Sequence, residues 1–65
     1  MKLYQIPRGT KVRLLADVSG PPGCGVYAQG DEFKLKNIDG MYSYCLDNNG
    51  DRAHLPAYAE VEVVT

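Results

Sequence analysis

The 65-residue chain lacks tryptophan and has only one phenylalanine and one histidine. It also lacks any run of about 18 apolar residues, the length that a membrane-spanning helix needs. The first residues, MKLYQIPRGTKV, contain no apolar segment of the kind found in secretory signals. We therefore expect a cytoplasmic protein, in the host cytoplasm if a phage encodes it, with no membrane partner. The chain has 7 basic and 8 acidic residues, so it also lacks a surplus of positive charge. This argues against a dedicated nucleic-acid-binding protein.

Helical periodicity is also missing from the sequence. No window of about 11 residues keeps apolar residues at i, i+3, i+4 and i+7. Glycine and proline instead interrupt the chain at short intervals, as they do in all-β proteins. A chain this short buries only about 60% of its unfolded surface, so its core is small. These features predict a single all-β domain over residues 1–65, with its barrel core at about 11–64.

The strongest local signal is the stretch EFKLKNIDGMYSYCLD, residues 32–47. Asp39-Gly40 is typical of a two-residue hairpin turn in which both residues adopt positive φ. That turn would place Leu35 opposite Tyr44 and separate an apolar face from a polar one. The predicted apolar face carries Phe33, Leu35, Tyr42, Tyr44 and Leu46. The predicted polar face carries Lys34, Lys36, Ser43 and Cys45.

A second turn at Asn49-Gly50 would extend this hairpin into a three-stranded meander. It predicts that Leu46 faces Ala53, Tyr44 faces Leu55 and Asp47 faces Arg52. The segments 11–18 and 60–65 alternate between apolar and polar residues and would pair with each other. In that pairing the basic side chains lie against acidic ones, Lys11 and Arg13 against Glu60 and Glu62. The alternation places Val12, Leu14, Ala16 and Val18 on one face and leaves Leu15 and Val64 pointing outward. We expect Leu3, Tyr4 and Ile6 to form a short extra strand.

Three stretches resemble SH3 domains. VYAQGDEFKL is similar to their strand, Gly-Asp turn and next strand, and DGMY is similar to their Asp-Gly-Trp-Tyr. NNGDRAHLPAYAEVEVV resembles their Asn-Gly turn, their Pro-Ser-Asn-Tyr segment and their closing strand. The resemblance implies a small SH3-like barrel of about five antiparallel strands, with one 3₁₀ turn at Pro56 before the last strand. Met41 replaces the family's ligand-binding tryptophan, and the SGPPGCG loop lacks acidic residues, which argues against a proline-rich peptide ligand.

The sequence offers weak signals for chemistry. Cys45 and His54 would be neighbours on the outer face, where a Cys–His pair could form a thiolate, but no orienting group accompanies them. Cys24, Cys45 and His54 could supply three zinc ligands, but their spacing does not match known zinc motifs. The SGPPGCG loop lacks the pattern of a phosphate-binding loop. We predict free cysteines, because cytosolic thiols stay reduced, and no enzymatic, metal or cofactor site.

The leading functional hypothesis is a non-catalytic interaction module that binds and modulates a larger protein of unknown identity. Loops at the rim of a rigid scaffold commonly carry binding. A bacterial or bacteriophage accessory protein fits this size, and a homodimer through LYQI, or through Leu15 and Val64, is an alternative. The predicted partner-binding residues are Pro21, Pro22, Cys24, Met41, Pro56 and Tyr58. The alternative function is nucleic-acid binding, with phosphate contacts from Lys11, Arg13, Lys34, Lys36 and Arg52.

Overall fold

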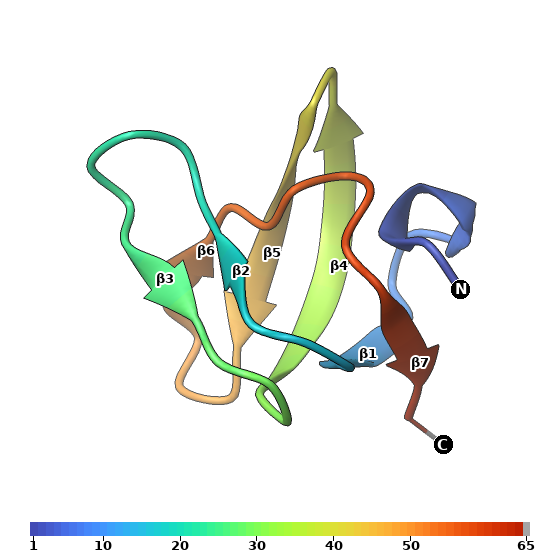
Figure 1. Ribbon diagram of the computed structural model, residues 1–65. Helices are drawn as coiled ribbons and strands as arrows, with labels where there is room; N and C mark the ends of the chain where they lie inside the picture. The colour runs from blue at the N-terminus through green and yellow to red at the C-terminus, as the bar shows by residue number, and fades with distance from the viewer. Residues whose placement is uncertain (65) are drawn as a thin grey trace.

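The computed structural model describes residues 1–64, which are all-β apart from one short 3₁₀ helix (Figure 1). Five strands form an antiparallel sheet in the order β6-β5-β4-β1-β7, and two more form a separate ribbon. The predicted all-β class with about five antiparallel strands is confirmed, and the likeness to SH3 domains stays a prediction. The elements are η1 (Leu3–Gln5), β1 (Lys11–Leu14), β2 (Val18–Ser19), β3 (Val26–Tyr27), β4 (Glu32–Asp39), β5 (Tyr42–Asp47), β6 (Arg52–Ala53) and β7 (Val61–Val63).

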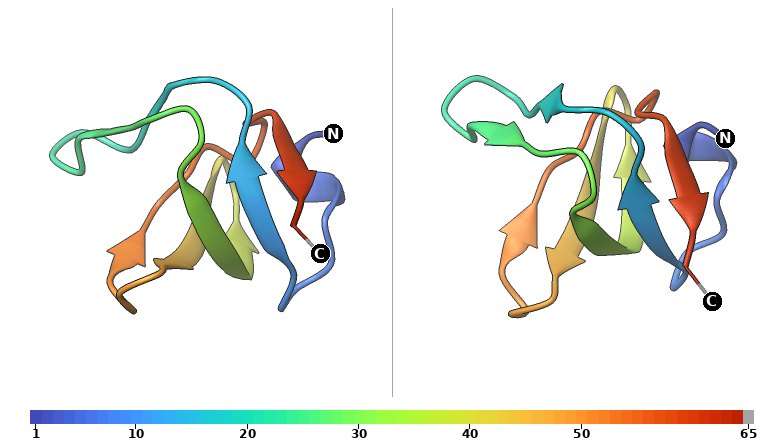
Figure 2. Two further views of the ribbon diagram at one scale, coloured as in Figure 1. Left: turned by 90° about the horizontal axis from the view of Figure 1, so that it is seen from below. Right: turned by 60° about the horizontal axis from the view of Figure 1, so that its bottom comes forward.

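Strand β1 links the β6-β5-β4 meander to the last strand, because it pairs with both β4 and β7. Its buried Val12 and Leu14 alternate with outward Lys11 and Arg13, as the period of a strand requires. The last strand therefore pairs with the first, as predicted. The predicted strand over 11–18 is interrupted after Leu14, however, and Ala16 is exposed rather than on the core face. The chain then continues into the β2–β3 ribbon, whose loop projects beyond the sheet (Figure 2).

The core draws apolar side chains from almost every element. The 3₁₀ helix and the residue after it contribute Leu3 and Ile6, which the sequence predicted as part of a strand. Each of these large side chains stabilises the fold by about 1.5–3 kcal/mol when it is removed from water. The side chains with less than 2% exposure are Leu3, Leu14, Leu35, Leu55, Val12, Val61 and Cys45.

The β4–β5 hairpin has a different register from the predicted one. Asp39 pairs with Tyr42, which leaves Gly40 and Met41 as the two central residues of the turn. Gly40 has a φ of +65°, which fits a type II′ turn with glycine at its first central position. The predicted turn needs positive φ at Asp39, and within residues 1–64 only glycines adopt positive φ. The turn therefore lies one residue further along the chain than predicted.

The turn slip alone moves each partner by two residues and would keep the predicted faces, but a bulge between Leu35 and Asn37 shifts the pairing back by one residue and reverses the faces of β5 relative to Leu35 and Phe33. Leu35 pairs with Cys45, which is buried, whereas Tyr44 is 36% exposed. Phe33 and Tyr44 consequently lie on opposite sides of the sheet. The predicted inward positions of Tyr42, Tyr44 and Leu46 were wrong, as were the predicted outward positions of Ser43 and Cys45. Because of this bulge, Leu35 is buried and Ile38 also packs against the core.

The β5–β6 hairpin also differs from the prediction, because its loop is one residue longer than the predicted two-residue turn. Its loop has three residues, 48–50, and the backbone N–H of Asp47 donates to the carbonyl of Asp51 at 2.9 Å. Gly50 closes the loop with a φ of +83°, as in three-residue hairpin loops that end in the left-handed region. Cys45 therefore faces Ala53, and Leu46 faces Arg52. The predicted pairs Leu46–Ala53, Tyr44–Leu55 and Asp47–Arg52 were wrong.

The proline before the last strand redirects the chain. Pro56 has no N–H to donate to a ladder, and the N–H of Ala59 closes one turn by donating to the Pro56 carbonyl at 3.0 Å. This i→i+3 bond has the geometry of a 3₁₀ turn, while the 3₁₀ helix itself is η1, where an extra strand was predicted. No helix among residues 1–64 is long and apolar enough to cross a membrane.

Candidate binding surfaces

Three predicted partner-binding residues converge at one end of the sheet. Met41 lies at the tip of the β4–β5 hairpin, and its carbonyl accepts a hydrogen bond from the N–H of Ala57 at 2.8 Å. Tyr58 follows Ala57, and the side chains of Met41 and Tyr58 are 69% and 61% exposed. Pro56 is buried, unlike Met41 and Tyr58, so its side chain is not part of the exposed surface. Pro56 instead begins the turn that presents Tyr58.

Tyr4, which the sequence analysis considered only within the LYQI segment of a possible homodimer contact, joins this surface. The backbone N–H of Tyr4 donates to the carbonyl of Ala57 at 2.9 Å, and the Tyr4 side chain is 58% exposed. Three residues with exposed large side chains therefore adjoin Ala57 through the backbone, each from a different chain segment. We call this surface, made of Tyr4, Met41 and Tyr58, the Ala57 patch. Its assembly depends on backbone hydrogen bonds between distant segments, which local sequence patterns do not reveal.

The other three predicted contact residues lie on the β2–β3 loop, which points away from the sheet (Figure 2). Pro22 and Cys24 are exposed, whereas Pro21 is half-buried. The loop is anchored at Gly20, where an added Cβ would approach the His54 carbonyl to 3.0 Å and the Tyr27 ring to 3.1 Å. The predicted surface is thus split between the Ala57 patch and this loop.

Cys45 and His54 do not form the predicted outward pair. Cys45 is fully buried, and its Sγ lies 3.2 Å from Ser43 Oγ. Burial raises the pKa of the Cys45 thiol above its ordinary value. The half-buried His54 instead places Nδ1 3.1 Å from the Ser43 carbonyl oxygen and packs edge-on against Tyr44. Within residues 1–64, no group of three or more His, Cys, Asp or Glu side chains could hold a metal ion.

The predicted nucleic-acid contacts are partly neutralised by ion pairs. Arg13 lies 3.0 Å from Glu32 and 2.7 Å from Glu62, and Lys11 lies 3.4 Å from Glu32. These contacts lower the pKa of Glu32, chiefly through the hydrogen bond from Arg13. Of the five basic residues, Lys34, Lys36 and Arg52 are exposed and make no ion pair within the described part of the chain.

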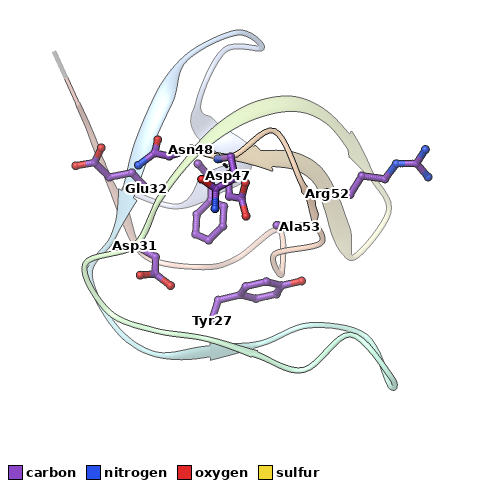
Figure 3. Close-up of a pocket in the computed structure, with 9 residues that line it drawn as sticks. Tyr27, Asp31, Glu32, Asp47, Asn48, Arg52 and Ala53 are labelled. Carbon is purple, nitrogen blue, oxygen red and sulfur yellow. Dashed lines mark hydrogen bonds between the residues drawn. The ribbon is translucent and has the colours of Figure 1, made fainter.

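A pocket of about 260 Å³ lies at the opposite end of β4 and β5 from the Ala57 patch (Figure 3). It forms between the segment that enters β4 and the β5–β6 loop. No sequence pattern indicated this pocket, because its walls come from segments that are distant in the chain. The lining residues are Tyr27, Asp31, Glu32, Phe33, Asp47, Asn48, Asn49, Arg52 and Ala53.

In comparisons with known proteins, the chain matched no family model, no curated protein and no solved structure.

Proposed function

We propose that this chain is a non-catalytic interaction module, an SH3-like barrel that binds and modulates a larger protein through the Ala57 patch. A bacterial or bacteriophage accessory protein is the setting that we propose for it. The observation that carries the proposal is the convergence of Tyr4, Met41 and Tyr58, all more than half exposed, around one buried residue.

The composition of the patch supports protein binding. Tyrosine and methionine are enriched at protein interfaces, and tyrosine is frequent among the residues that dominate binding energy. Large apolar side chains that gather on one surface of a small protein mark interaction sites more often than scattered ones do. Tyr4, Met41 and Tyr58 come from three segments that are distant in sequence, so their proximity is a product of the fold.

The backbone beneath the patch is well supported. Ala57 is 8% exposed, its N–H and carbonyl are used by Met41 and Tyr4, and the neighbouring Pro56 forms a bridge with Tyr42. A surface that is held in place before binding loses less conformational entropy when a partner docks. The patch is therefore suited to specific binding even though it is small.

Affinity capture from the native host, followed by calorimetry with the identified partner, tests this proposal. The Met41→Ser, Tyr58→Ser double variant should weaken binding at least about tenfold, or about 1.4 kcal/mol, because two anchor side chains are lost. Val26→Ser is the matched control, since Val26 is 71% exposed but lies on the ribbon strand β3. Circular dichroism shows that the variants remain folded.

Unchanged affinity of the double variant for the captured partner would refute the proposed surface. Sedimentation equilibrium separates a further outcome, in which the patch binds a second copy of the chain. In that case the wild type dimerises and the double variant does not, and the module acts on itself rather than on a larger protein.

A further inference from the structure

The pocket at the end of β4 and β5 combines two unpaired carboxylates with an aromatic wall. Asp31 lies just before β4, and Asp47 is the last residue of β5. Neither makes an ion pair within residues 1–64. Figure 3 shows the side chains of Asp31 and Tyr27 on one side of the pocket and those of Asp47 and Asn48 on the other.

The two carboxylates are held in place by backbone groups. Oδ1 of Asp47 accepts hydrogen bonds from the N–H groups of Asn49 at 2.8 Å and Asp51 at 2.9 Å. Oδ2 of Asp31 accepts one from the N–H of Ala28 at 3.2 Å. Each carboxylate therefore keeps its second oxygen for a guest, and its position is set before binding. Such charge-assisted hydrogen bonds are strongest when the acceptor is already oriented.

The aromatic wall is equally constrained. The Tyr27 and Phe33 rings meet edge to face, with centroids 5.6 Å apart, and the Tyr27 hydroxyl accepts a hydrogen bond from the N–H of His54 at 3.2 Å. The small side chain of Ala53 completes the lining. An aromatic ring beside carboxylates attracts a cation that carries apolar or planar surface, because the ring and the carboxylates act on the same charge.

The remaining charges on the lining decide the sign of the guest. Glu32 is already paired with Lys11 and Arg13. The guanidinium of Arg52 points away from the pocket (Figure 3), where solvent screens it. Two available carboxylates therefore outweigh one distant cation. At about 260 Å³ the pocket is smaller than the roughly 300–1,000 Å³ sites of drug-sized ligands, and it suits a single side chain.

We infer that this pocket binds the side chain of an arginine presented by a peptide or protein. Guanidinium is planar, can bond two carboxylates at once and stacks on aromatic rings, whereas ammonium is a compact point charge. The site is separate from the Ala57 patch, since the six residues of β5 span roughly 17 Å between them. The inference goes beyond the proposed function and does not require that the patch bind anything.

Titration with N-acetyl-arginine amide, followed by two-dimensional amide NMR, tests the inference. Shifts should concentrate on the amides of residues 28–31 and 47–53 and should saturate in the millimolar range. Asp31→Asn and Asp47→Asn keep the oxygens that accept the backbone hydrogen bonds but remove the charge, so each should weaken binding about fivefold. Asp39→Asn removes one charge at the far end of β4 and should leave binding unchanged.

Three further arms fix the chemistry of the guest. N-acetyl-citrulline amide, which has nearly the same shape without the charge, should not bind, and N-acetyl-lysine amide should bind several-fold more weakly. Arg52→Ala should strengthen binding because it removes a like charge. Absence of localised shifts, equal binding of the citrulline compound, or an Asp39→Asn effect as large as that of Asp31→Asn would overturn the site. Equal binding of the lysine compound would overturn its assignment to arginine. Each result leaves the proposed function of the Ala57 patch standing, because no probe touches it.

Discussion

Cys45 should react with thiol reagents several orders of magnitude more slowly than an exposed cysteine. Its side chain is fully buried, and burial raises the pKa of its thiol. The thiolate is the nucleophile that attacks the reagent, so Cys45 has to become exposed and ionised before it can react. In the predicted register, with Tyr44 inward, Cys45 would instead sit on the outer face. Its reactivity therefore reports the register of the β4–β5 hairpin.

The size of the protection follows from the free energy of opening. A chain of this length is expected to have about 5 kcal/mol of unfolding free energy, the low end of the usual range. Each 1.4 kcal/mol or so changes an equilibrium constant about tenfold. Because Cys45 packs at the centre of the core cluster, its exposure requires opening of the core. The native rate should then be about 5,000-fold below the rate of the unfolded chain.

The Cys24→Ser variant isolates Cys45, because Cys24 is the exposed cysteine. A disulfide reagent such as Ellman's reagent gives the rate for the native variant, and the same variant in denaturing urea gives the intrinsic rate. The Cys45→Ala variant, which retains Cys24, should react without a lag. A native rate for Cys24→Ser within about tenfold of its rate in urea would show that Cys45 is accessible. The inward placement of the Cys45 side chain would then be wrong.

Two further predictions concern stability. Hydrogen bonds from Arg13 and Lys2 lower the pKa values of Glu32 and Glu60 below the ordinary 4.5, so their stabilisation is present above about pH 4.5 and is lost as the pH falls through the folded-state values. The urea midpoint should fall on acidification below pH 4.5, and it should fall by less in Arg13→Met than in the control variant Lys36→Met. Equal acid sensitivity of these two variants would count against the ion pairs. Gly50→Ala should cost about 1 kcal/mol in urea unfolding, because its φ of +83° is strained for other residues while an added Cβ meets no atom within 4 Å. Asn48→Ala, in the same loop, should stay within about 0.5 kcal/mol of the wild type, and a Gly50→Ala cost no larger than that would contradict the loop geometry.

The meander of β4, β5 and β6 and the pairing of β1 with β7 could be predicted from the sequence, because they depend on alternation and on glycine-bearing turns. The β2–β3 ribbon and the break after Leu14 could not. The register could not, since Asp39-Gly40 and Gly40-Met41 are both acceptable two-residue turns. The first is type I′ and needs positive φ at Asp39, whereas the second is type II′ and needs it only at Gly40. Local turn preference alone does not choose between them, and the bulge between Leu35 and Asn37, which shifts the pairing by one residue and so reverses the faces of β5, is not marked by a glycine.

The candidate sites were predictable only in part for the same reason. Met41 and Tyr58 could be located because each lies beside a turn that the sequence marks clearly. Tyr4 and the Asp31–Asp47 pocket could not, because they depend on contacts between segments that are distant in the chain. The Ala57 hydrogen bonds bring Tyr4 to the patch, and the three-residue loop after Asp47 sets that carboxylate opposite Asp31.

The size of the core explains why the II′ turn combined with the bulge between Leu35 and Asn37 suits this sequence. Together they turn Ser43 and Cys45 inward, opposite Ile38 and Leu35 of β4. The alternative would force Tyr42 and Tyr44 into the same space, and overpacking of that kind typically costs about 1–3 kcal/mol. The inward Ser43 carries little penalty, because its hydroxyl donates to the Leu55 carbonyl at 3.0 Å. A thin core therefore selects the small residues of β5, while the II′ turn places Met41 at the hairpin tip, beside Ala57.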